Sequence, residues 1–223
     1  MRDNIQIIRK KVKNFNLRIK PNLEVVLSVP LYVSDKQIND FLSQKEKWIT
    51  EKIEYLSKLN LPVKQKEYVD GELILYLGDE FVLEIVKSSK NHCIVHDKII
   101  VLYIKDKDDF KKKEATINNF YKNKAKELFE ELLVNTLELF NEKNNITFQV
   151  RKMKSIWGSC NKSKRKITLN TNLMMQHKSF IEYVIAHEVA HLKHANHSKD
   201  FYNWLALYMP DWKERKNKSI RSF

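Results

Sequence analysis

Apolar and polar positions follow two different periods in the N-terminal part of the chain. Alternation of apolar and polar side chains predicts short antiparallel strands over residues 5–10, 15–19 and 23–29. Pro21-Asn22 supplies a turn signal between the last two strands. From Ser34 onward the apolar side chains recur at helical spacing, which predicts a helix that is capped by Ser34 and ends before Pro62.

The middle of the chain returns to strands and then changes to a long helix. Residues 68–104 contain β-branched runs separated by turn signals at residues 70–71, 77–79 and 88–91. Residues 109–142 carry apolar side chains on or near one stripe, which predicts the longest helix of the chain.

The final third predicts a strand pair followed by a helix. Residues 148–153 and 167–170 have the pattern of strands, and the polar segment 158–165 is expected to be the loop that joins them. Ser179 and Glu182 match a capping box, with Ser179 as the N-cap of the helix. The buried side of this helix is expected to consist of Ile181, Val184, Ile185 and Val189.

This last helix carries a pattern with a chemical meaning. His187 and His191 are four residues apart, so their imidazoles lie on one helical face, about 6 Å apart along the axis, and can bind one cation. Glu188 lies beside that face, where it can act as general base on a water molecule bound to the metal. A zinc ion lowers the pKa of such a water to about 7 and polarises a scissile carbonyl.

A catalytic zinc site needs a third protein ligand, and two nearby histidines compete for the position. His194 lies on the face of the first ligand but about 10 Å further along the helix axis, too far for a tetrahedral site. His197 fits if the helix breaks at Ala195-Asn196 and a new helix begins after a Ser198 cap. The spacing therefore favours His197 as the third ligand.

These segments closely resemble the YgjP-like family of zinc metallopeptidases, which is related to the SprT-like and WLM zincins. The resemblance rests on His187–Phe201, preceded by Trp157–Cys160 and Ile167–Asn170, and its weaker N-terminal part extends it over nearly the full chain. It implies a peptide or protein substrate, Glu188 as catalytic residue and Zn²⁺ bound by His187, His191 and His197. His194 stands where metzincins carry glycine, which argues against membership of that group.

Charge offers a second hypothesis. The 223 residues carry a net charge of +13, but 34 of the 41 cationic side chains are lysine and only seven are arginine, the residue that recognises phosphates in bidentate geometry. The lysines are spread along the whole chain, so a solvated basic surface is favoured over a nucleic-acid footprint. A DNA-associated SprT-like protease and a protein with a structural, non-catalytic zinc remain the alternative functions.

Composition excludes several classes of protein. With 43% hydrophobic residues, three glycines and four prolines, the chain is neither disordered nor collagen-like. No apolar run approaches the roughly 18 residues of a membrane span, and the N-terminal residues lack a secretory signal, so we expect a cytoplasmic protein with reduced cysteines.

Several side chains near the predicted site have open roles. Trp157 and Gly158 are expected to pack under the metal helix and make a turn, although this segment could also meet an extended substrate. Cys160 could approach the zinc as a thiolate. Cys93 could form a second metal cluster with its neighbours His92 and His96, although incidental placement is favoured. The candidate donors to the transition-state oxyanion are Tyr183, Tyr202, Tyr208 and Arg151.

The sequence thus predicts an α+β fold with two domains. Residues 1–105 are expected to form a β-rich module with one helix, and residues 106–223 a minimal zincin-like metallopeptidase domain. The expected reaction is zinc-dependent hydrolysis of peptide bonds.

Overall fold

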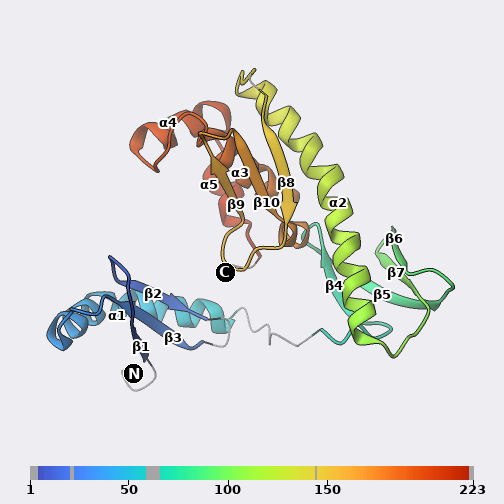
Figure 1. Cartoon of the computed structure of the whole chain (residues 1–223), viewed down its shortest axis with the longest axis horizontal. Helices are drawn as coiled ribbons and strands as arrows, with labels where there is room; N and C mark the ends of the chain where they lie inside the picture. Colours follow the sequence, from blue (N-terminus) through green and yellow to red (C-terminus); the bar gives the residue numbers. More distant parts are fainter. Residues whose placement is uncertain (1–4, 21–22, 59–65, 144, 221–223) are drawn as a thin grey trace. The chain divides into compact units, whose positions relative to one another are not determined.

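The computed structural model describes residues 5–20, 23–58, 66–143 and 145–220, with the side chains of 55–58 excepted (Figure 1). It is a mixed fold of small sheets and helices, which confirms the predicted α+β class. The chain divides into two compact units, residues 1–66 and residues 67–222. No helix among the described residues has an apolar stretch long enough to cross a membrane.

The first unit contains a three-stranded sheet and one helix. Its elements are β1 (Ile5–Arg9), β2 (Asn16–Ile19), β3 (Val25–Val29) and α1 (Asp35–Lys58). All of β3 is buried, and it lies in the middle of the sheet in the order β1-β3-β2. β2 and β3 are antiparallel as predicted, but β1 runs parallel to β3, so the antiparallel prediction is wrong for β1. Alternation identifies a strand without indicating its neighbour or its direction.

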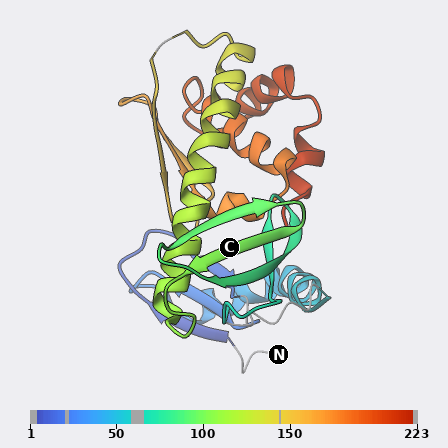
Figure 2. The same cartoon turned by 90° about the vertical axis from the view of Figure 1, so that its right-hand side faces the viewer.

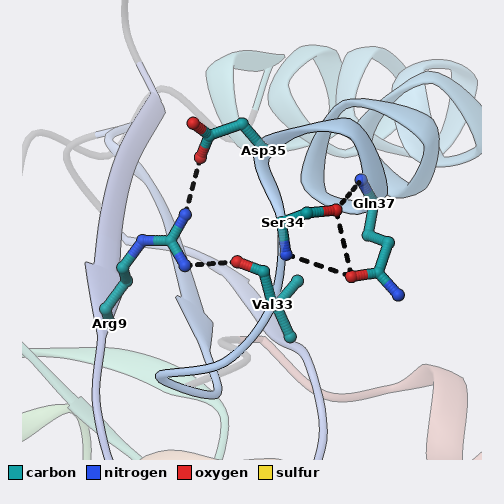
Figure 3. Close-up of polar contacts among 5 residues, drawn as sticks. All are labelled: Arg9, Val33, Ser34, Asp35 and Gln37. Atoms are coloured by element: carbon teal, nitrogen blue, oxygen red, sulfur yellow. Dashed lines mark hydrogen bonds and ion pairs between the residues drawn. The ribbon is translucent and has the colours of Figure 1, made fainter.

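The start of α1 is a capping box tied to the end of β1 (Figure 3). The Ser34 hydroxyl accepts the Gln37 N–H at 3.3 Å, and the Gln37 side-chain oxygen accepts the Ser34 N–H at 3.0 Å, which confirms the predicted cap. The Arg9 guanidinium donates to the Asp35 carboxylate at 2.6 Å and to the Val33 carbonyl. The predicted turn at Pro21-Asn22 and the segment around Pro62 lie outside the described residues.

The second unit begins with a four-stranded sheet in the order β4-β5-β7-β6. Its strands are β4 (Leu73–Tyr76), β5 (Asp79–Lys87), β6 (His92–His96) and β7 (Ile99–Ile104). They confirm the strands predicted over residues 68–104. The turns before and after β4 contain Gly71 and Gly78 in the left-handed region, with φ of 79° and 92°, which is why glycine occupies them.

Helix α2 (Phe110–Leu139) confirms the predicted long helix (Figure 2). Its buried side chains belong to the hydrophobic core of the second unit. Its N-cap Asp109 accepts the Lys112 N–H at 3.0 Å. The same core contains Leu102 of β7, Phe129 of α2 and Ile185 of α3 (Lys178–Ala190). The predicted domain boundary at residue 105 therefore lies inside this unit, between two elements that pack together.

The rest of the second unit combines a three-stranded sheet with short helices. Its elements are β8 (Thr147–Arg151), β9 (Gly158–Asn161), β10 (Lys166–Asn170), the 3₁₀ helix η2 (Thr171–Met175), α3 (Lys178–Ala190), α4 (Lys199–Tyr208) and α5 (Trp212–Asn217). β8 and β10 were expected, and they pair in parallel. The prediction of a loop over residues 158–165 is wrong for β9, which pairs antiparallel with β10. Only this pairing makes the short polar segment a strand.

Candidate metal centre

The helix that carries the HExxH pattern begins differently from its prediction. α3 starts at Lys178 after the N-cap His177, and no side chain caps it, so the capping box predicted for Ser179 is wrong. The Glu182 carboxylate instead forms an ion pair with the Arg215 guanidinium of α5. Because α3 already begins at Lys178, Ser179 lies inside its first turn and cannot be the N-cap residue.

The end of α3 explains how distant histidines meet. α3 ends at Ala190, five residues before the break expected at Ala195-Asn196, and the chain turns between His191 and His197. The Ser198 hydroxyl then accepts the Phe201 N–H at 3.3 Å and caps α4 as predicted. The reversal returns His197 to the C-terminal end of α3 instead of carrying it away along a continuous helix.

Three imidazoles converge at this point. The Nε2 atom of His197 lies 2.9 Å from Nε2 of His187 and 3.1 Å from Nε2 of His191. The three ligand atoms form a group that could hold one metal ion. Tetrahedral zinc with bonds of about 2.0–2.1 Å separates its ligands by about 3.3 Å, close to the spacing found here. The three side chains therefore fit one ion.

The protonation of these histidines suits metal binding. Burial, together with the nearby His191 and His197, lowers the pKa of His187 to about 3. Burial likewise lowers the pKa of His191. Both imidazoles are therefore neutral near pH 7, which is the form that binds a cation.

Two polar contacts and one ring orient the cluster. The His191 Nδ1–H donates to the main-chain carbonyl of His194 at 2.9 Å, and His187 Nδ1 lies 3.4 Å from the Tyr183 hydroxyl. With a proton on Nδ1, each ring directs the lone pair of Nε2 toward the cluster. The fully buried Phe201 ring packs against all three imidazoles, with centroids 4.6–5.0 Å apart. The spacing of the histidines does not indicate this contact, because Phe201 meets the imidazoles only through the turn that leads into α4.

His194 itself does not join the metal cluster. Its imidazole lies beside the Trp204 ring, with centroids 6.1 Å apart, and only its carbonyl contacts the cluster through His191. The structure thus places the side chain of His197, and not that of His194, with His187 and His191.

Glu188 is the acidic group of this centre. It is 6% exposed, and burial raises the pKa of its carboxyl to about 7. No described residue donates a hydrogen bond to the carboxylate, so its oxygens are free to accept a proton. It follows His187 on α3 and faces the start of β9.

The other candidate ligands are not brought together with the histidines. Burial and the charge of Glu188 raise the pKa of the Cys160 thiol to about 11, so this cysteine is a neutral thiol. His92 stacks on Tyr103 with centroids 4.5 Å apart, and burial raises the pKa of the Cys93 thiol to about 12. In the described parts of the chain, the three histidines on α3 and the following turn are the one group suited to a metal.

The four candidate oxyanion donors have different surroundings. Tyr183 contacts His187, and the Tyr202 ring lies 6.2 Å from the His197 ring. Tyr208 instead stacks on Phe140, with centroids 4.5 Å apart. Arg151 ends β8 and is exposed.

Comparison with known proteins identifies related sequences and structures. A family model described as YgjP-like, metallopeptidase domain, matches residues 13–219. The solved metallopeptidase zymogen abylysin of Pyrococcus abyssi is 22% identical, the match covering 40% of this chain and 89% of that chain at a TM-score of 0.37. The zymogen jannalysin of Methanocaldococcus jannaschii is 23% identical, with 40% and 91% covered and the same TM-score, 0.37. None of the curated proteins matches the chain.

Proposed function

The chain belongs to the YgjP-like metallopeptidase family, and on that premise we propose that it is a zinc peptidase in which Glu188 activates the attacking water. Membership confirms the resemblance drawn from its sequence motifs. The observation that carries the proposal is the convergence of the three imidazoles at the end of α3, the helix on which Glu188 carries a buried carboxylate that accepts no hydrogen bond from a described residue.

His187, His191 and His197 would hold the metal through Nε2. When bound, zinc lowers the pKa of water and polarises the carbonyl of the scissile bond. The main-chain carbonyl of His194 and the Tyr183 hydroxyl keep the imidazoles oriented, as the groups behind metal ligands generally do. Phe201 excludes solvent from the inner side of the three rings.

Glu188 is the residue that moves protons. Its carboxylate accepts a proton from water as the oxygen attacks the carbonyl carbon of the substrate. The same group then delivers that proton to the nitrogen that leaves when the peptide C–N bond breaks. Because no described side chain neutralises the carboxylate, it is available for both steps.

The ligand number favours a catalytic over a structural ion. Structural zinc is almost always held by four protein groups, whereas catalytic zinc keeps one position open. Among the described residues, no fourth His, Cys, Asp or Glu joins the cluster, and the Cys160 thiol is neutral. The open position would accept the water or the substrate carbonyl.

A digest of an unbiased peptide library, analysed by mass spectrometry, tests the proposal. The zinc-loaded protein should cleave peptides, a chelator should stop the reaction, and added zinc should restore it. One zinc per chain without cleavage of any peptide would instead support the structural-zinc alternative.

A further inference from the structure

The chain has only three glycines, and they are needed for different reasons. Gly71 has a φ of +79° with open space around the position of a side chain, so its backbone conformation requires glycine. Gly158, at the start of β9, has no such φ, and an L-residue could adopt its conformation. Conformation therefore does not explain the glycine at 158, contrary to the turn expected there.

Lack of space does explain it. A Cβ atom on Gly158 would lie 2.7 Å from both Cγ and Oε1 of Glu188, and 3.0 Å from its Cδ. Non-bonded carbon atoms prefer separations of about 3.5–4.0 Å. The carboxylate of Glu188 therefore occupies the volume that any side chain at 158 would need.

The main chain around Gly158 is held in place by residues of β10. The Asn170 N–H donates to the Trp157 carbonyl at 2.8 Å, and Gly158 is paired with Leu169 of β10. The fully buried Asn170 amide also donates to the carbonyls of Met153 and Ile156, at 2.9 and 2.8 Å. Because these bonds fix the backbone, the Glu188 side chain is the part that must move if a Cβ is added.

We propose that Gly158 is a positioning residue for Glu188: with no side chain at 158, the main chain of β9 forms a wall that holds the Glu188 carboxylate in place beside the three histidines. The catalytic meaning of this inference rests on the proposed peptidase function. The steric relation between the two residues does not, and the two can be tested separately.

The first test uses stability and needs no activity. Thermal unfolding is measured for the full chain, for Gly158→Ala, for Glu188→Ala and for the double variant. Gly158→Ala should lower Tm by about 2–4 °C when Glu188 is present, as overpacking does, and by much less in the Glu188→Ala background, where Cγ, Cδ and Oε1 are absent.

The second test uses the zinc-loaded protein and a cleaved peptide. Gly158→Ala should retain one zinc per chain and an unchanged KM, while kcat falls at least about tenfold through misplacement of the base. Ser159→Ala, on the exposed neighbour in the same strand, is the matched control and should leave kcat unchanged. Glu188→Asp shortens the acid by one methylene, so adding Gly158→Ala to it should reduce kcat less than in the wild-type background.

The outcomes separate the two proposals. The positioning role would be overturned if Gly158→Ala lowered Tm equally in the wild-type and Glu188→Ala backgrounds and lowered kcat equally in the wild-type and Glu188→Asp backgrounds. Loss of zinc from Gly158→Ala would also overturn it. Coupling in Tm together with no peptidase activity in the wild-type protein would leave the steric relation intact and reject the proposed function.

Discussion

The Nδ1 atom of His191 lies 2.9 Å from the main-chain carbonyl oxygen of His194. His194 thus contributes a backbone atom that orients a neighbouring imidazole, although the sequence offers its side chain as a rival ligand. The turn that makes this contact also brings His197 to within 3.1 Å of His191, Nε2 to Nε2.

This relationship predicts which histidines hold zinc. Replacing His187, His191 or His197 with Ala should each abolish stoichiometric zinc, because three ligands are the minimum for a catalytic site. His194→Ala keeps the carbonyl and should retain one zinc per chain. Elemental analysis of the purified variants measures this, and zinc retained in His197→Ala but lost in His194→Ala would reverse the assignment.

A substitution at Glu188 should affect catalysis without affecting zinc binding. Glu188→Gln has the same size but cannot accept the proton of water, so zinc content and Tm should be retained while the rate of peptide hydrolysis falls by about 10²–10⁴. Peptide cleavage followed by mass spectrometry checks this. Full activity in a preparation verified to contain zinc would eliminate Glu188 as the base.

The Tyr183 hydroxyl should contribute to metal affinity through His187. Its oxygen lies 3.4 Å from Nδ1, a long contact, so Tyr183→Phe should weaken zinc binding by about tenfold, at the low end for groups behind metal ligands. Competition with a chelating dye gives the affinity. Tyr208→Phe is the matched control, since that ring stacks on Phe140, and an equal loss in both variants would argue against the contact.

The state of Cys160 can be tested directly. Because burial and Glu188 raise its pKa to about 11, the thiolate fraction at pH 7.5 is about 100-fold below that of an unperturbed cysteine, and alkylation should be correspondingly slow. The rate should increase about tenfold per pH unit until the thiol titrates. Cys160→Ser should keep its zinc, whereas zinc loss in that variant would restore the thiolate-ligand alternative.

The cap of α1 predicts a local loss of stability. Ser34→Ala removes the acceptor of the Gln37 N–H and should cost about 1 kcal/mol (Figure 3). Hydrogen exchange across Asp35–Lys58, measured by mass spectrometry, should become faster. Ser43→Ala is the control, since the Ser43 hydroxyl donates to a carbonyl within the helix, and exchange there should be little changed.

The features that the sequence predicts correctly are mostly those that depend on residues close together in the chain. The spacing of His187 and His191 fixes both on one helical face, and the caps at Ser34 and Ser198 each involve residues three positions apart. The strands over residues 68–104 have the period of a sheet with one buried face. These features depend on neighbouring residues, so they can be predicted from the order of side chains.

Tertiary structure decided everything that depends on distant partners. β9 is a strand because β10 lies beside it, and Glu182 forms an ion pair with Arg215, which is 33 positions away. Glu188 fills the volume that a side chain at Gly158 would need, although the two residues are thirty positions apart in the sequence. No spacing rule predicts that contact. Packing between elements has no local period, so pairing partners, ion pairs and steric limits emerge only when the chain is folded.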